Sequence, residues 1–282
     1  MSSEATNSEQ TNSKQLYAEL LDLAVATARA AGDLARDGRE SAMDVQTKSS
    51  AVDVVTAMDK AAEALIAARL LGARPQDGIL GEEGADVVGS SGVRWVVDPI
   101  DGTVNYLYRI PAWSVSIAAE LDGRAVAGAV YVPLLGEMYS ATLGGGATLA
   151  GGPTGDGVPL RVNSDARLGH ALVGTGFGYD SGRRARQGAL VAQLLPQVRD
   201  IRRFGSCAVD LCALAAGRLD AYFERGLQPW DMAAGVLIAR EAGARVEGLH
   251  GAPSSPELLI AANPALFPAL HDALAPLDPT SG

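Results

Sequence analysis

The sequence has little cysteine, histidine or aromatic residue, and it lacks any long apolar run. Its 282 residues include 2 Cys and 3 His, and Phe, Trp and Tyr make up 5%. No apolar stretch approaches the ~20 residues that cross a bilayer, so we expect no membrane association. Residues 1–14 are polar throughout, which predicts a disordered tail and not a signal peptide. The two cysteines, Cys207 and Cys212, are expected to be buried thiols in a reducing cytoplasm.

Positive charge is also scarce. Lys and Arg number 23 against 33 Asp and Glu, which leaves a formal net charge of −10, and no basic block stands out. This composition argues against binding to nucleic acid through its phosphate backbone. If the substrate is itself anionic, a bound metal ion is the natural source of positive charge beside it.

What the chain has in quantity is aliphatic residues. The hydrophobic fraction of 48% is enough for a sizeable core, in one large domain or two closely packed halves. Apolar periodicity and turn residues predict an N-terminal α+β half over residues 15–150 and a C-terminal α/β half over 151–282, with a glycine-rich boundary at 144–158. Helices are expected at 15–35, 57–71, 183–195, 206–216, 232–242 and 264–274. Strands are expected from 79 into an acidic loop, at 94–97, in an antiparallel meander between 113 and 142, and at 170–174, 201–204, 219–223 and 258–262.

The most informative segment is residues 95–103, which read WVVDPIDGT. Asp98 and Asp101 lie three positions apart at a strand end, and in such a turn the Ile100 carbonyl can point the same way as both carboxylates. Three hard oxygen ligands suit Mg²⁺, and the lack of His or Cys argues against zinc. A turn begun at Gly102 and Thr103 would turn backbone N–H groups toward an anion. The same residues are also good turn formers, so the segment alone leaves both interpretations open.

Three other acidic segments also have ordinary structural interpretations when each is taken alone. Asp231 begins a helical pattern and is a normal candidate for a helix N-cap. Glu82 and Glu83 lie between glycines, in a loop where charges are usually solvated. Residues 48–59 end in Asp59, and their charges could form the cap and exposed face of the next helix.

Together and in this order, the four segments resemble the inositol monophosphatase family of Mg²⁺-dependent, lithium-sensitive sugar phosphatases, in its bacterial form. The resemblance extends from about Lys48 to Gly243, and residues 95–103 and 230–235 match the two signatures of the family. It implies a layered αβαβα sandwich of the inositol monophosphatase and fructose bisphosphatase type, with the active site between the halves. It also implies a homodimer, inhibition by lithium and hydrolysis of a small polyol phosphate, with inositol 1-phosphate as the first candidate.

The resemblance assigns two or three Mg²⁺ ions to the site. Glu82, Asp98 and the Ile100 carbonyl would bind one ion, and Asp98, Asp101 and Asp231 would bind a second. Glu82 would help to hold a third ion more weakly. Such ions activate water, neutralise phosphoryl oxygens and stabilise the leaving alkoxide, with no covalent intermediate.

The remaining roles also come from the resemblance. Thr103 would orient the attacking water with help from Asp59, and the amides of Gly102 and Thr103 would hold the phosphate. The segments that contact the hydroxyls of the sugar or inositol ring contain Gly205, Ser206, Cys207 and Glu224.

Two alternatives remain open. One is the same chemistry on fructose 1,6-bisphosphate, 3′-phosphoadenosine 5′-phosphate or histidinol phosphate. Glu224 favours a hydroxyl-rich substrate, because a carboxylate accepts hydrogen bonds from hydroxyls and repels a second phosphate. Arg202, Arg203 and Arg225 lie close enough in sequence to weaken that argument. The other alternative is a regulatory binding protein that keeps the same fold.

Overall fold

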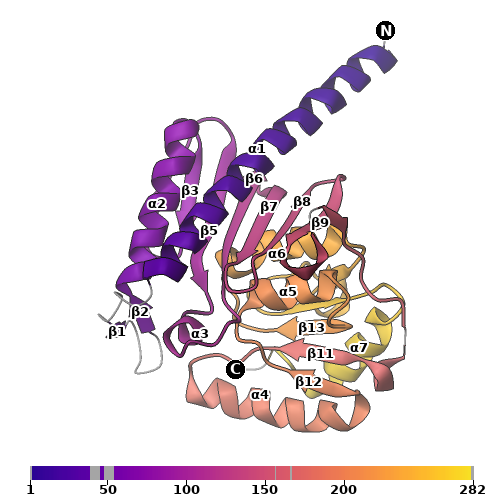
Figure 1. Ribbon diagram of the computed structural model, residues 1–282. Helices are drawn as coiled ribbons and strands as arrows, with labels where there is room; N and C mark the ends of the chain where they lie inside the picture. Colours follow the sequence, from indigo (N-terminus) through magenta and orange to yellow (C-terminus); the bar gives the residue numbers. More distant parts are fainter. Residues whose placement is uncertain (1, 39–44, 48–53, 156, 166, 281–282) are drawn as a thin grey trace.

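Helices and sheets alternate through the protein as an αβαβα sandwich (Figure 1), which confirms the predicted fold class. The computed structural model describes residues 2–38, 45–47, 54–155, 157–165 and 167–280. Residues 48–53 of the predicted acidic segment 48–59, and the first residue of the predicted tail, lie outside the described residues. Among the described helices, none is long and apolar enough to cross a membrane.

The first sheet has eight strands in the order β10-β9-β8-β7-β6-β5-β3-β4. Strands β5 to β9 pair as antiparallel neighbours, whereas β3 runs parallel to β5. The meander predicted between 113 and 142 is therefore confirmed. The strands are β3 (Gly78–Gly81), β4 (Asp86–Val87), β5 (Val93–Asp101), β6 (Ser114–Leu121), β7 (Arg124–Val132), β8 (Glu137–Thr142), β9 (Gly146–Gly151) and β10 (Val158–Pro159). Their central strands are apolar on both faces because helices cover both faces.

The outer helices α1 (Ser2–Gly38) and α2 (Ala57–Ala73) cover one face of this sheet. Leu20, Ala24 and Ala28 of α1 form a buried stripe that packs in one cluster with strand residues such as Trp95 and Ile117. The two-stranded sheet of β1 (Val45–Thr47) and β2 (Val54–Thr56) precedes α2.

Helix α1 begins earlier than the sequence predicts. Residues 2–14, expected to form a disordered tail, continue the helix to Ser2. The segment holds neither Gly nor Pro, so a helix already anchored on the sheet meets no breaker as it extends toward the N-terminus. Extension of an existing helix is much easier than nucleation.

Helices α5 (Cys207–Ala215) and α6 (Pro229–Glu241) form the middle layer. Small residues allow them to approach the sheets closely. A Cβ on Gly128 of β7 would lie only 3.2 Å from the Cα of Ala234 in α6. Cys207 and Cys212 are buried free thiols in α5, as predicted.

The second sheet has five strands in the order β12-β11-β13-β15-β14. Strand β11 is parallel to β12 and β13, and β15 is antiparallel to β13 and β14. The strands are β11 (Leu172–Thr175), β12 (Asp200–Arg202), β13 (Ala221–Glu224), β14 (Arg245–Glu247) and β15 (Leu259–Ala262). Helices α4 (Ser181–Leu194) and α7 (Phe267–Leu274) cover its outer face. Short 3₁₀ turns occupy Gly152–Thr154, Leu168–His170, Leu195–Gln197, Leu249–Gly251 and Ala275–Leu277.

Some elements of the structure were not predicted from the sequence. The unexpected elements are strands β1, β2, β4, β9, β10 and β14 and the short helix α3 (Thr103–Leu107). The glycine-rich segment 144–158 contains β9 and reaches β10, so the expected boundary at 150/151 falls inside β9, and both strands belong to the first sheet. Pairing with β8 decides the structure of this segment, because strand formation depends more on a neighbouring strand than on local preference.

Candidate active site

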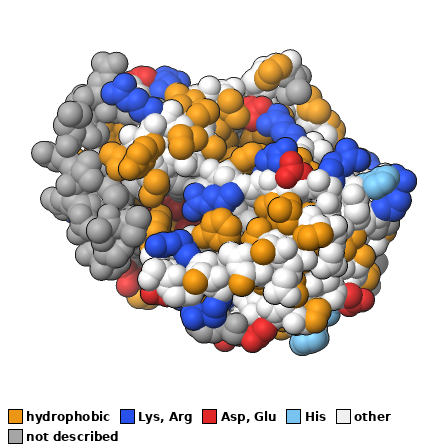
Figure 2. Space-filling view, turned by 90° about the horizontal axis from the view of Figure 1, so that it is seen from below, with side chains coloured by type: hydrophobic (Ala, Val, Ile, Leu, Met, Phe, Trp, Pro, Cys, Tyr) orange, Lys and Arg blue, Asp and Glu red, His pale blue; other side chains and the backbone are white. Residues whose placement is uncertain are grey.

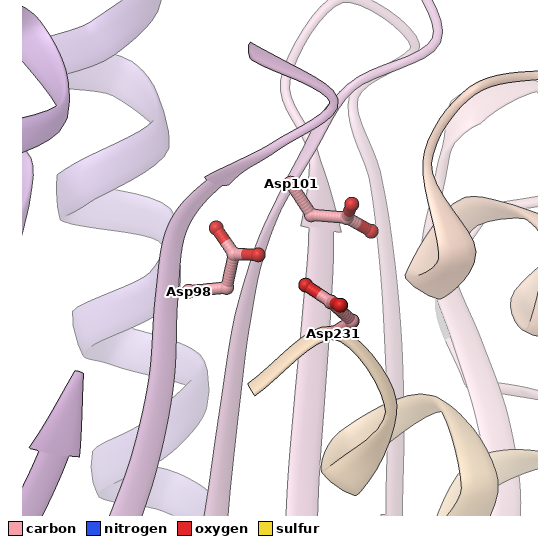
Figure 3. A group of neighbouring side chains, drawn as sticks. All are labelled: Asp98, Asp101 and Asp231. Carbon is pink, nitrogen blue, oxygen red and sulfur yellow. The ribbon is translucent and has the colours of Figure 1, made fainter. Parts of the chain in front are cut away.

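Three carboxylates converge where β5 meets the start of α6. Asp98 and Asp101 come from β5, and Asp231 comes from the first turn of α6 (Figure 3). One carboxylate oxygen from each residue lies within 4.8 Å of the others. Residues three apart on a regular strand face opposite sides of the sheet. The pairing of β5 with β6 shifts register between Asp98 and Asp101, and this irregularity lets both side chains face Asp231.

Strand β5 therefore does not stop at Asp98 as the sequence suggests, but continues through Pro99 to Asp101. Local hydrogen bonds hold its irregular end in place. The Ile100 amide donates to Oδ1 of Asp98 at 3.0 Å, and Oγ1 of Thr103 donates to the Ile100 carbonyl at 3.1 Å. Residues 95–103 thus satisfy both interpretations, because the same turn also brings the oxygen atoms of Asp98 and Asp101 together.

Asp101 joins the end of β5 to the start of α5. Its Oδ2 accepts hydrogen bonds from Oγ of Ser206 and from the Ala208 amide, each at 2.7 Å. Asp231 is similarly fixed, because its Oδ2 accepts a hydrogen bond from the Gln228 amide at 2.6 Å. Gln228 is the N-cap of α6, so Asp231 does not occupy the cap position itself.

The acids of the cluster have raised pKa values, because they are buried close to one another. Burial first, and then the charges of Glu82, Asp101, Asp231 and Asp59, raise the pKa of Asp98 well above its usual range. Burial raises the pKa of Asp101 to about 6 even though hydrogen bonds to its carboxylate lower it. Burial and the charge of Asp101 raise the pKa of Asp231. A divalent cation would relieve this repulsion, and hard carboxylate oxygens are the donors that Mg²⁺ prefers, so the residues fit such an ion.

Glu82 reaches the site from the turn between β3 and β4, and a second acid holds that turn. Glu63 of α2 is buried and accepts hydrogen bonds from the Glu83 amide at 2.7 Å and the Ala85 amide at 2.8 Å. Glu63 was not among the predicted site residues. The available signal was an acidic side chain beside Ala62 and Ile66, on the buried face of a predicted helix.

The acids line one side of a pocket with a volume of about 350 Å³. The pocket brings together every predicted site residue except Asp59: Glu82, Asp98, Ile100, Asp101, Gly102, Thr103, Gly205, Ser206, Cys207, Glu224 and Asp231. Asp59 is buried in the first turn of α2, and its charge acts on Asp98. Arg183, Arg203 and Arg225 also line the pocket. Figure 2 shows Lys and Arg side chains near the middle of the face seen from below, with acidic atoms recessed beside them.

Gly102 makes the turn from β5 into α3 possible. Its φ of 93° is in the left-handed region, and a Cβ there would lie 3.1 Å from the Ala112 carbonyl oxygen and 3.2 Å from that of Gly205. The side-chain amide of Asn105 ties the same region together, because it donates to the carbonyls of Ala112 and Phe204 at 2.6 Å each. The amides at the start of a helix lack partners within it, so this turn places N–H groups at the pocket.

Glu224 also lines the pocket, at the end of β13. The Tyr222 hydroxyl donates a hydrogen bond to its Oε2. Burial raises the pKa of Glu224 to about 7, while that hydrogen bond and the charge of Arg203 act in the opposite direction. A Cβ on Gly176 would overlap the Glu224 carboxylate, so glycine at this position leaves room for the carboxylate where it lies. Arg202 does not line the pocket and instead pairs with Asp200 on the surface.

Comparison with known proteins agrees with this geometry. The model of the inositol monophosphatase family matches residues 16–277. The chain belongs to the inositol monophosphatase family. Inositol monophosphatases are metal-dependent phosphoric monoester hydrolases, so this family member is a phosphatase whose acidic cluster is suited to hold metal.

Three similar proteins illustrate the range of this family. The chain is 50% identical over 238 residues to the inositol-1-monophosphatase of Mycobacterium leprae, covering 82% of this chain and 81% of that protein. It is 44% identical to Mycobacterium tuberculosis SuhB, whose structure superimposes with a TM-score of 0.80 over 94% of this chain and 98% of that one. It is also 40% identical over 240 residues to the Nus factor SuhB of Escherichia coli K12, covering 82% and 86% of the two chains.

Proposed function

We propose that this inositol monophosphatase family member hydrolyses inositol 1-phosphate, or a similar polyol phosphate, to the polyol and inorganic phosphate with two or three Mg²⁺ ions. The observation that carries the proposal is the convergence of Asp98, Asp101 and Asp231 on one side of a pocket that also presents Glu224. The Mycobacterium leprae relative, named inositol-1-monophosphatase, supports the choice of substrate.

The residues that would hold Mg²⁺ are Glu82, Asp98, Asp101, Asp231 and the Ile100 carbonyl. When bound, Mg²⁺ supplies positive charge for the phosphoryl oxygens and lowers the pKa of a bound water. The protein's part is to keep these oxygens in fixed orientations, which the hydrogen bonds to Asp98, Asp101 and Asp231 do before any ion arrives. Such preorganisation avoids a reorganisation cost during reaction.

Thr103 and Asp59 would orient the attacking water. The Thr103 hydroxyl donates to the Ile100 carbonyl, which leaves its oxygen lone pairs available to accept a hydrogen bond from water. The amides of Gly102 and Thr103 hold the phosphate through N–H donors that α3 does not use internally. The chain thus contributes positioning and electrostatics, and no side chain of its own forms a covalent intermediate in this scheme.

The polyol end of the substrate would meet Glu224, Gly205, Ser206 and Cys207. Because the pKa of Glu224 lies near 7, its carboxyl group is present both as an acceptor and as a donor at neutral pH. Either form can hydrogen-bond a hydroxyl, since hydroxyls both donate and accept. A ring with several hydroxyls is the chemistry that matches this side of the pocket.

The direct test is release of inorganic phosphate from inositol 1-phosphate with and without Mg²⁺, beside fructose 1,6-bisphosphate. We expect Mg²⁺-dependent release from the inositol ester. Asp98→Asn and Asp231→Asn should each lower kcat/KM by at least about a hundredfold, since even the residues that merely support metal ligands contribute 10–100-fold. Circular dichroism of both variants should match the wild type. Near-normal activity in both variants would refute the assigned metal site.

A second candidate function is regulatory binding on the same fold, and the name of the Escherichia coli relative as a Nus factor favours testing it. A chromosomal Asp98→Asn allele separates the two functions. Retention of the cellular phenotype would assign that phenotype to binding, whereas its loss would assign it to catalysis. Activity on fructose 1,6-bisphosphate, 3′-phosphoadenosine 5′-phosphate or histidinol phosphate remains the alternative within the same chemistry.

Three further expectations rest on family resemblance alone. We propose a homodimer, a cytoplasmic location and inhibition by lithium through displacement of a weakly held Mg²⁺. Light scattering, cell fractionation and a lithium titration at several Mg²⁺ concentrations test them in turn.

A further inference from the structure

The pocket contains an arginine that the proposed hydrolysis does not use. Arg183 belongs to the first turn of α4, in the outer helix layer, and lines the same pocket as the acids of β5 and α6. Two glycines leave room for its side chain. A Cβ on Gly178 would lie 2.7 Å from the Arg183 Cδ, and a Cβ on Gly226 would lie 2.6 Å from its Nη1. The guanidinium therefore occupies a slot between the loop after β11 and the loop after β13.

The walls of this slot are held firmly. The Gly178 amide donates to Oε1 of Gln187 at 3.0 Å, and Nη1 of Arg184 donates to the Tyr179 carbonyl at 2.6 Å. Both partners lie on α4, so the loop after β11 is fastened to the helix that carries Arg183. The position of the guanidinium is thus determined by surrounding backbone and not by an ion pair.

The Arg183 side chain has unmet hydrogen-bonding capacity. Its Nε is buried and has no hydrogen-bond partner, and no carboxylate of the described residues lies within ion-pair distance of the guanidinium. A buried N–H without an acceptor is costly. The edge of a guanidinium that carries Nε and one Nη matches two oxygens of a phosphate or a carboxylate. An anion in the pocket would therefore satisfy this group.

The slot lies beside the hydroxyl-binding side of the pocket. Gly176 abuts Glu224, and Gly178, two residues further along the same loop, abuts Arg183. A polyol that hydrogen-bonds Glu224 would bring its neighbouring substituent toward Arg183. The acids at Asp98, Asp101 and Asp231 define the place of the hydrolysed phosphate, so an anion at Arg183 would be a second one.

We propose that Arg183, between Gly178 and Gly226, forms a subsite for a second anionic group on the substrate. The substrate class is a polyol or sugar phosphate that carries another phosphate or a carboxylate. This inference rests on the proposed function, because it assumes that the first phosphate binds at the acidic cluster.

Matched substrate pairs test the subsite. Fructose 1,6-bisphosphate and fructose 1-phosphate differ by one phosphate, and 6-phosphogluconate and glucitol 6-phosphate differ by one carboxylate. We expect kcat/KM to favour the doubly anionic member of at least one pair by about tenfold or more, and the favoured pair identifies the anion. Arg183→Gln should reduce that preference to near one. No preference in either pair, or a preference that survives Arg183→Gln, would overturn the proposal.

Two more variants separate position from charge. Arg186→Gln removes the same charge from an exposed part of α4 outside the pocket lining, and it should keep the wild-type preference. Gly178→Ala leaves the charge in place but pushes Arg183 aside, and the φ of Gly178 is not in the left-handed region. It should reduce the preference as Arg183→Gln does. An equal loss in Arg186→Gln would mean that general charge and not the slot is responsible.

A binding measurement covers the case in which no ester is hydrolysed. Calorimetric titration of both substrate pairs with Ca²⁺ present uses an ion that accepts the same carboxylate ligands. If the doubly anionic member of a pair binds about tenfold more tightly and Arg183→Gln removes the difference, the subsite stands although the proposed function fails. Equal Kd values within both pairs would refute the proposed subsite whether or not the protein hydrolyses any of these esters.

Discussion

At the scale of single residues, the acids of this protein divide into those that face the pocket and those that hold its walls. Asp98, Asp101 and Asp231 face one another. Burial raises the pKa of all three, and the charges of neighbouring acids raise those of Asp98 and Asp231 further. Glu63 differs, because both of its oxygens accept backbone hydrogen bonds from the turn that carries Glu82. One type of side chain therefore serves two purposes, which only its hydrogen-bond partners distinguish.

Glu63→Gln should weaken metal binding without unfolding the protein. The amide nitrogen of Gln would face a backbone N–H, so one of the two hydrogen bonds to the turn is lost and Glu82 moves. Loss of a residue that supports a metal ligand typically costs 10–100-fold in affinity. We expect the Mg²⁺ concentration for half-maximal phosphate release to rise about tenfold. Asp86→Asn, at an exposed position after the same turn, is the matched control. An unchanged Mg²⁺ requirement in Glu63→Gln would show that the β3–β4 turn keeps its conformation without the hydrogen bonds to Glu63.

At the scale of elements, polar side chains clamp the layers together at two places. Glu241 of α6 accepts hydrogen bonds from the Gly144 and Gly146 amides at 2.8 and 2.9 Å and so holds the β8–β9 turn. Glu137 of β8 accepts two hydrogen bonds from Arg218, at 2.8 and 2.6 Å, and one from Tyr139 at 2.6 Å. Arg218 follows α5, so this second clamp joins the first sheet to the middle layer.

Glu137→Gln should destabilise the fold in a pH-dependent way. Burial alone would raise the pKa of Glu137, but the hydrogen bonds from Arg218 and Tyr139 outweigh it and leave the pKa lowered. The clamp therefore stabilises the fold above the ordinary Glu pKa of about 4.3 and loses its effect as the pH falls through the lowered value. At pH 7 we expect the variant to lose about 1–2 kcal/mol of unfolding free energy, because hydrogen bonds to charged groups contribute about 1.5–3 kcal/mol.

Urea unfolding at several pH values measures this effect. The difference between wild type and Glu137→Gln should shrink below about pH 4. Asp200→Asn removes an acid from the exposed Asp200–Arg202 pair and should show no measurable loss at neutral pH. A difference for Glu137→Gln that stays constant with pH would contradict the role given to its charge.

At the scale of the whole molecule, the site lies where the first sheet, the middle helices and the second sheet meet. Asp101 ends β5 of the first sheet, and Gly102 follows it. Ser206 precedes α5, and Asp231 lies in the first turn of α6, so both belong to the middle layer. Glu224 ends β13 of the second sheet. Packing of apolar layers therefore forces like charges together. The site is held against its own repulsion by the rest of the fold.

Removal of one of these charges should stabilise the metal-free protein. In EDTA, Asp98→Asn relieves repulsion from Asp101 and Asp231, and Asn can still accept the hydrogen bond from the Ile100 amide. We expect its Tm to exceed that of the wild type by about 2–4 °C, the shift that corresponds to about 1 kcal/mol. Mg²⁺ should raise the Tm of the wild type clearly and that of the variant little. Calorimetry checks both statements, and a lower Tm for Asp98→Asn in EDTA would contradict the account of the repulsion.

Much of the fold and of the pocket was predictable from short segments of sequence. The apolar runs at 94–97 and 113–142 predicted buried strands, and residues 95–103 and 230–235 predicted where acids would gather. The structure places all the predicted site residues but Asp59 around one pocket, and their individual roles stay predictions. The helical extension to Ser2 and strands β9 and β10 were not predictable, because anchoring or pairing with neighbours decides them.

Asp98 and Asp101 were recognisable as candidate ligands without a structure, because one short segment combines both carboxylates with the turn-forming residues Pro99 and Gly102. Which distant residues support and extend that site depends on how the whole chain packs. Glu63 holds a turn about twenty positions away, and Arg183 lies between Gly178 and a glycine of another loop. Hydrogen bonds and close contacts between distant segments leave no periodic trace in a sequence. They exist only once the apolar layers have packed.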